Sequence, residues 1–212
     1  MKNLYKFILL LLVPLFLFSC GGGEEQTAEK GTPSLSKSDE QLLQTAADKL
    51  IMKFHNNLKM ELGKALKEGG PANAINVCSE IAPEIADSFS ANGWKIKRVS
   101  DKNRNPNNHP TPAQMAFLEL FAADSTRGLK HASNYDGEIF HYYKPIHTNS
   151  LCLTCHGDKD NLAPEVVEKL NERYPDDKAT GYDVNQLRGM FVVDIKMPEG
   201  KHYAEEIAGS ES

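Results

Sequence analysis

The chain has 212 residues, 25% of them charged, and a formal net charge of −5 at pH 7. Nucleic acid is not an expected partner, because phosphate binding requires a clustered basic face and the sequence has none. The length is sufficient for one domain with a hydrophobic core once the N-terminal segments are set aside.

The N-terminus is typical of a bacterial lipoprotein signal peptide. Two lysines precede an apolar run over residues 7–18, which is too short to span a bilayer. Ser19 and Cys20 follow, then three glycines, a pattern that resembles a lipobox. We expect residues 1–19 to be removed and Cys20 to be lipidated; an ordinary signal peptide is the alternative.

Residues 20–37 are rich in Gly, Glu, Ser, Thr and Lys, so they are expected to form a disordered tether. Removal of residues 1–19 takes away two lysines and no acid, which changes the formal charge from −5 to −7. The expected location is the periplasmic side of the inner or outer membrane, or the cell surface. The membrane is then a partner through the N-terminal lipid.

A long helix is predicted to open the folded part, because apolar residues recur at three- and four-residue spacing over residues 42–66. Ser38 and Gln41 form a predicted capping box at its start, and Gly69-Gly70 is predicted to end it. Its length suggests a signalling or a packing helix.

Pro71 is predicted to begin a second helix, which Asn92-Gly93 ends. One face of this helix is apolar and carries Cys78. Pro83 lies inside the pattern and cannot donate to the carbonyl of Ser79. We therefore expect a kink one turn after Cys78.

The remaining elements alternate between strands and short helices. Strands are predicted over residues 94–99, 128–134, 139–146 and 187–195, and helices after Thr111 and Pro164. An Asp136-Gly137 turn joins the middle two strands as a hairpin. This order predicts an α+β domain over residues 38–197, with 198–212 as a C-terminal tail.

The cysteines carry the strongest functional signal. Cys152 and Cys155 are followed at once by His156, so two thiols could bond the vinyl groups of a haem while the imidazole coordinates its iron. Such attachment requires an exported protein, which the signal peptide predicts independently. A zinc ribbon, a thioredoxin-type pair and a plain disulfide are the alternatives, and each leaves part of the motif unexplained.

Cys78 remains as an unpaired thiol on an apolar helix face. It could be a small buried hydrophobic residue, which is common for free cysteine, or a thiolate sixth ligand to the iron. Residue chemistry leaves both possibilities open.

Several short motifs stand in order along the chain: Ala74–Cys78, Ala82–Ala86, Lys97–Ser100, Arg104–Pro106, Tyr143–Ile146, Cys152–Gly157, and Gly181-Tyr182 with Leu187–Gly189. Together they resemble the PAS-like c-type-haem domain family, whose members occur alone in exported proteins and as sensor parts of signalling proteins. The resemblance implies a central antiparallel sheet with flanking helices and one covalent haem c. It also implies axial ligation by His156 on one side and Cys78 on the other.

A thiolate opposite an imidazole favours ferric iron and a low potential, which suits sensing better than bulk electron transport. The leading hypothesis is a redox or small-ligand sensor in which reduction releases Cys78 and shifts the kinked helix. We expect its output to reach an unidentified redox partner or signalling protein. A monohaem electron carrier is the alternative, with Met115, Met190 or a histidine as sixth ligand; an enzyme is not expected.

Other cofactor contacts are less specific. Arg98, Arg104 and Arg188 are candidate partners of the haem propionates, with solvated arginines as the alternative. A peroxidase-like enzyme would need a positioned acid or base, for which the sequence offers His109, His131, His141 and His147.

Overall fold

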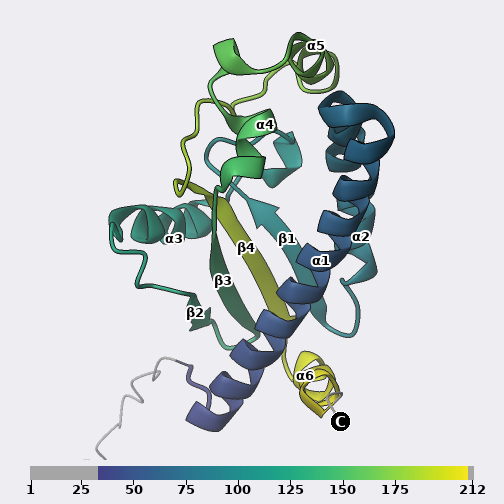
Figure 1. The fold of residues 1–212 in the computed structure, drawn as a ribbon. Helices are drawn as coiled ribbons and strands as arrows, with labels where there is room; N and C mark the ends of the chain where they lie inside the picture. Colours follow the sequence, from purple (N-terminus) through teal and green to yellow (C-terminus); the bar gives the residue numbers. More distant parts are fainter. Residues whose placement is uncertain (1–32, 210–212) are drawn as a thin grey trace, which may run out of the picture. The chain divides into compact units, whose positions relative to one another are not determined.

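A long helix and a four-stranded sheet organise the protein in the computed structural model, which describes residues 33–209 (Figure 1). The predicted signal peptide, Cys20 and most of the predicted tether lie outside the described residues. Among residues 33–209, no helix combines the length and apolar character that crossing a membrane requires.

The long helix α1 spans Lys37–Asn76, and its N-cap lies two residues before the predicted one. Ser36 has extended backbone angles, and its hydroxyl accepts a hydrogen bond of 3.1 Å from the Asp39 amide. Ser36 is therefore the N-cap, and the prediction of a capping box at Ser38 is wrong. The predicted interruption is confirmed, because Gly70 has a φ of +70° and divides α1 into two helical segments.

The second segment of α1 runs into a π-helical turn, η1, over Val77–Ile81. In this turn the Ala82 amide donates to the Val77 carbonyl, five residues earlier. Helix α2, Ala82–Ser88, follows with Pro83 in its first turn, where a missing N–H costs little. The predicted irregularity therefore exists, but it includes Cys78 instead of following it.

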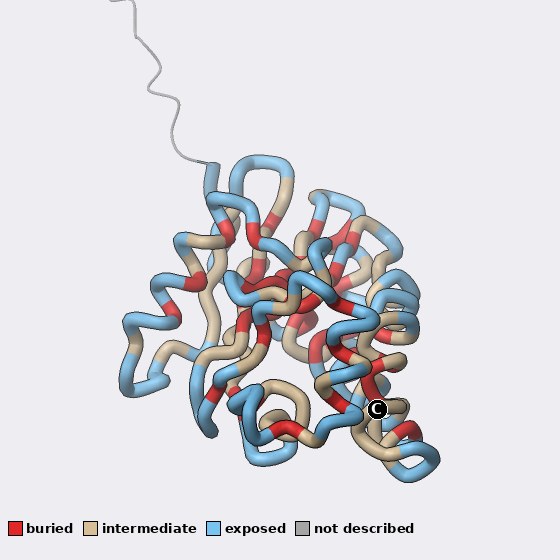
Figure 2. Tube along the Cα trace, turned by 90° about the horizontal axis from the view of Figure 1, so that it is seen from above, coloured by how far each residue is buried: buried red, intermediate tan, exposed pale blue. Residues whose placement is uncertain are grey.

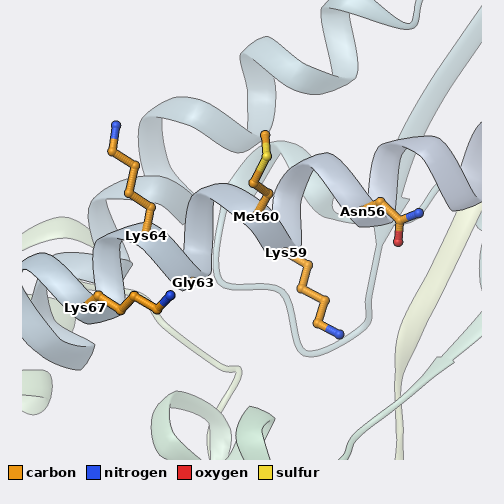
Figure 3. Close-up of a pocket in the computed structure, with 6 residues that line it drawn as sticks. All are labelled: Asn56, Lys59, Met60, Gly63, Lys64 and Lys67. Carbon is orange, nitrogen blue, oxygen red and sulfur yellow. The ribbon is translucent and has the colours of Figure 1, made fainter.

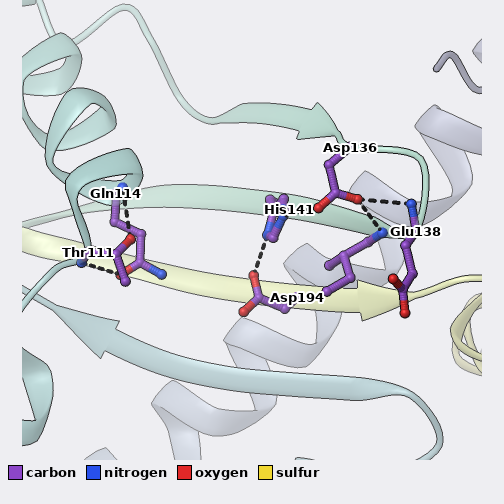
Figure 4. Close-up of polar contacts among 7 residues, drawn as sticks. Thr111, Gln114, Asp136, Glu138, His141 and Asp194 are labelled. Atoms are coloured by element: carbon purple, nitrogen blue, oxygen red, sulfur yellow. Dashed lines mark hydrogen bonds and ion pairs between the residues drawn. The ribbon is translucent and has the colours of Figure 1, made fainter. Parts of the chain in front are cut away.

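The sheet is antiparallel throughout, in the order β1-β4-β3-β2. Its strands are β1 Trp94–Val99, β2 Ala132–Tyr135, β3 Ile139–His147 and β4 Leu187–Lys196. The Asp136 carboxylate accepts from the amides of Glu138 and Ile139 and shapes the predicted hairpin turn (Figure 4). Strand β2 is shorter than predicted.

Helices cover both faces of this sheet, and the buried residues lie between the layers (Figures 1 and 2). Alternate residues of β4 face opposite sides: Val193 packs against α1, whereas Val192 packs against α3, Pro112–Ala123. The predicted capping box of Thr111 and Gln114 starts α3 and is confirmed (Figure 4). The predicted α+β class, with a central antiparallel sheet and a long N-terminal helix, is also confirmed.

Short helical segments connect the end of β3 to the start of β4. They are η3 Ser150–Cys152, α4 Leu153–His156, η4 Lys159–Asn161 and α5 Pro164–Arg173; a further short segment, η2 Pro106–Asn108, follows β1. The helix predicted after Pro164 is α5, and it buries Val166 and Leu170.

The segment predicted as a C-terminal tail is instead mostly helical and packed on the domain. Residues Glu199–Gly209 form helix α6, whose Ala204 and Ile207 join the core between α1 and the sheet. The buried indole N–H of Trp94 donates to the carbonyl of Gly200 at 2.7 Å. The folded domain therefore continues through α6.

Candidate functional site

The Cys-x-x-Cys-His motif forms a tight helical corner at the end of the sheet where β3 ends. Asn149 caps this corner, since its side-chain oxygen accepts from the amides of Leu151 and Cys152 at 2.9 and 3.3 Å. Cys152 and Cys155 are separated by about one turn, and both are half-buried free thiols. The corner therefore presents the two thiols and His156 together.

The imidazole of His156 is fixed in one tautomer. Its Nδ1 lies 2.7 Å from the carbonyl oxygen of Ala179, which can only accept, so Nδ1 carries the proton and Nε2 is left to coordinate. Burial, with the nearby charges of Arg104 and Arg188, lowers the pKa of His156 well below its usual value. A neutral ring of this kind is ready to act as a metal ligand.

A buried ion pair contacts the backbone of the motif and stabilises it. Arg104 lies 3.0 Å from the Asp177 carboxylate, and both side chains are almost fully buried. The guanidinium of Arg104 also donates to the Cys155 carbonyl at 2.6 Å. Asp177 accepts in turn from the Ala179 amide at 2.9 Å. We call Arg104 and Asp177 the clamp, because together they fix the motif to the residue that orients His156.

Backbone hydrogen bonds connect the motif to the same loop. The amides of Gly181 and Tyr182 donate to the carbonyls of Gly157 and His156 at 2.8 and 3.0 Å. The Tyr182 ring stands edge-on to the imidazole, with ring centroids 6.4 Å apart. The ligand geometry of His156 is therefore set by residues 177–182 as well as by its own helix.

Cys78 lies close to this corner. Its half-buried thiol interacts electrostatically with Cys155, whose pKa is raised mainly by burial. Cys78 also interacts with Arg98 on β1. Arg98 acts in addition on His156, where its charge contributes to the lowered pKa. The structure therefore brings Cys78, Arg98 and the motif together.

The two arginines of the sheet have different surroundings. Arg98 lies over the Phe54 ring, 5.6 Å from its centroid, and burial lowers its pKa. Arg188 lies 5.4 Å from the centroid of Tyr182 and donates to the carbonyl of Lys102.

The surroundings of Arg188 test whether a haem fits this site. Its Nε is buried without a hydrogen-bond partner among the described residues, and the buried Tyr182 hydroxyl beside it makes no hydrogen bond of good geometry. Unsatisfied buried donors are rare, and a carboxylate of a bound group would satisfy them. With His156 Nε2 available, these residues fit a haem carrying propionates. Arg104, by contrast, already has protein partners.

The other candidate ligands lie in separate surroundings. Met115 and Met190 pack in the cluster between the sheet and α3. The histidines are dispersed: His109 is exposed, His131 stacks on Tyr142, His141 pairs with Asp194, and His147 lines a cavity beside β3. As sixth ligands they remain predictions.

Sequence reasoning missed Asp177 and Ala179. Asp177 lies in a polar loop whose only signal was a pair of adjacent acids, and Ala179 acts through its backbone carbonyl, which any residue would provide.

The chain is similar to one protein family and to one solved structure. Residues 28–196 match the model of the Tll0287-like family. The chain is also similar to the crystal structure of the cyanobacterial heme-protein Tll0287, with 28% sequence identity and a TM-score of 0.57. The similarity covers 78% of this chain and 99% of that one. No curated protein matches this chain. The family resemblance inferred from the sequence motifs is confirmed.

Proposed function

This chain belongs to the Tll0287-like family, and from that membership we propose that it binds one haem c, attached through Cys152 and Cys155. His156 and Cys78 would be the two protein ligands of its iron. The observation that carries the proposal is the convergence of Cys78 and the motif on Arg98. The Tll0287 protein, to which this chain is similar, is described as a heme-protein.

The chain's own residues prepare both ligands. The bond from His156 Nδ1 to Ala179 supports a neutral ring with Nε2 directed to the iron, and it increases the basicity of that nitrogen. Arg98 is a cation close to Cys78, and the thiolate is the form in which a cysteine binds metal. Arg188 would hold a propionate through its unsatisfied Nε.

A redox or small-ligand sensor is the function that this ligand set supports best. Bound haem would supply a one-electron couple and a coordination position that a small molecule can occupy. Cys78 lies in the π-helical turn η1, and such turns occur often at functional sites because they are less stable than a continuous helix. A cysteine released from the iron could therefore change the path of this turn, which is a change that a partner protein could detect.

Anchoring at the membrane belongs to the same proposal. Lipidation of Cys20 would place the domain on the periplasmic side of a membrane or at the cell surface, which agrees with the export that c-type haem attachment requires. In that location a signalling or redox partner would meet the protein close to the membrane.

The decisive experiment replaces Cys78 with alanine in the haem-loaded protein. Loss of an anionic donor should change the ferric absorption spectrum and raise the reduction potential by at least about 59 mV, equal to a tenfold change in a one-electron equilibrium. Carbon monoxide should bind the ferrous variant faster than the wild type, because a coordination position is open. The matched control is Ser79→Ala, which removes a hydrogen bond of 3.1 Å to Asn76 within the same turn.

Two results would reject parts of the proposal. If Cys78→Ala leaves spectrum and potential unchanged, Cys78 is a core residue, and the electron-carrier alternative with another sixth ligand takes its place. If the double variant Cys152→Ala/Cys155→Ala still retains haem through acid–acetone extraction, the attachment itself is wrong.

A further inference from the structure

A second cavity, of about 560 Å³, lies beside β3 and shares no residue with the haem site. It is lined by two segments distant in sequence: Thr126, Arg127, Leu129 and Lys130 from the loop after α3, and Lys144, Pro145 and His147 from β3. The volume is within the range of small-molecule sites. We call this the β3 edge cavity.

The cavity exists because the sheet is incomplete at this edge. Strand β2 pairs only with residues 140–143 of β3. From Lys144 to His147 no described strand lies on the outer side of β3, and the loop carrying Arg127 lines that position instead. The edge is therefore open to a ligand.

The loop wall of the cavity is held in a defined shape. The Asp124 carboxylate accepts from the Thr126 hydroxyl at 2.6 Å and from the Leu129 amide at 2.6 Å. Arg127 takes a φ of +54° at the turn, and its carbonyl accepts from Lys130 Nζ at 2.7 Å. These contacts bring the two cations to one side of the cavity before any ligand binds.

The charges in the cavity are mostly positive and incompletely neutralised. Neither Arg127 nor Lys130 forms an ion pair with a carboxylate of the described residues, whereas Lys144 pairs with Asp48 at 2.6 Å. Burial first, and then the charges of Arg127 and Lys130, lower the pKa of His147, while the charge of Asp124 opposes them. The carboxylate of Asp124 is already engaged by its own loop. An anion would relieve this repulsion.

We propose that the β3 edge cavity binds a small organic anion that carries a phosphate or carboxylate group. Arg127 and Lys130 bind the charged end. Leu129 and Pro145, the apolar residues of the lining, contact the remainder of the ligand. The proposal does not depend on the haem.

A different cavity on α1 provides the control. It has about 580 Å³ and is lined by a single helix: Asn56, Lys59, Met60, Gly63, Lys64 and Lys67 (Figure 3). Its three lysines point in different directions, so they do not converge on one ligand. A double substitution there changes the net charge as much as one in the β3 edge cavity.

The test is an NMR titration of the full chain with phenyl phosphate, with phenol as the uncharged control. Backbone amides of residues 126–130, 144, 146 and 147 should shift with phenyl phosphate and not with phenol. Arg127→Gln/Lys130→Gln should weaken binding at least about tenfold, equal to about 1.4 kcal/mol. Lys64→Gln/Lys67→Gln should bind as the wild type does, and Arg127→Lys should retain most of the affinity.

Several outcomes would overturn the proposal. These are an absence of binding by the wild type, equal weakening by both double variants, or shifts located away from the cavity. Cosedimentation with phosphatidylglycerol vesicles without any response to phenyl phosphate would overturn it as well and assign the surface to lipid. Should the double variant lose its dispersed spectrum, Lys130→Gln alone gives the comparison, because it keeps Arg127 and the bonds from Thr126 and Leu129 to Asp124.

Discussion

Replacing Arg104 with glutamine should destabilise the fold by about 3 kcal/mol. The pair with Asp177 has side chains only 6% and 11% exposed, so removal of the cation leaves a carboxylate in a poorly solvated position. Breaking a buried pair costs about 3–5 kcal/mol. The lower value applies here because Asp177 keeps its bond from the Ala179 amide, although the Cys155 carbonyl loses its donor.

Thermal unfolding followed by circular dichroism measures this loss. For a domain of this size about 1 kcal/mol corresponds to about 2–4 °C, so the midpoint should fall by about 6–12 °C. The matched control is Arg173→Gln, whose partner Glu80 also lies 3.0 Å away, but with side chains 36% and 54% exposed. Solvent screens such a pair, and its loss should cost less than about 1 kcal/mol.

A double-mutant cycle isolates the pair itself. Arg104→Gln combined with Asp177→Asn should be less destabilised than the sum of the two single variants, because the second change removes the uncompensated charge. If Arg104→Gln lowers the free energy of unfolding no more than Arg173→Gln does, the clamp does not hold the motif. The same conclusion follows if the effects of Arg104→Gln and Asp177→Asn are additive.

Three further predictions concern the anchor, the motif and the loop after α3. Cys20→Ala should release the protein from the membrane fraction without loss of haem, and retention after high-salt washing would contradict lipidation. Gly157→Ala should lower the unfolding midpoint, because its Cβ would come within 2.7 Å of the Leu153 carbonyl oxygen, whereas Gly63→Ala in open space should raise it slightly. Hydrogen bonds, chiefly from the Thr126 side chain, lower the pKa of Asp124 below its unfolded value. The stabilisation is therefore complete above the unfolded pKa and lost as pH falls through the folded one, so the amide-exchange protection factors of this loop, corrected for intrinsic exchange, should fall only below about pH 4. Asp124→Asn should abolish that acid dependence.

Elements with strong local signals could be predicted closely from the sequence. The bounds of β1 agree with those predicted for residues 94–99, because a glycine turn precedes the strand and apolar and polar side chains alternate over its first three residues. Helix α6 was missed because only Ala204 and Ile207 are buried besides a glycine, which is too few to show a helical period. The start of α1 was misplaced by two residues because Ser36 and Ser38 are both suitable caps, and only the chain direction distinguishes them.

In the candidate site too, residues with a local sequence signal could be predicted, and residues that meet only through the fold could not. Cysteine spacing indicated Cys152, Cys155 and His156, and Pro83 indicated an irregular helix near Cys78. The clamp could not be predicted, because Asp177 and Arg104 are 73 residues apart and meet only through the fold.

The break at Gly69-Gly70 has a consequence for how this protein can change over evolution. In an uninterrupted helix, one inserted residue turns everything beyond it by about 100°. An insertion in the first segment of α1 would then rotate Cys78 away from its present direction. Because the chain turns at Gly70, the second segment packs Ala74 and Val77 back against Ala65 of the first segment. A residue added at Gly70, which has open space around it, can therefore leave both packed segments in register and Cys78 in position, whereas a residue added within the first segment cannot.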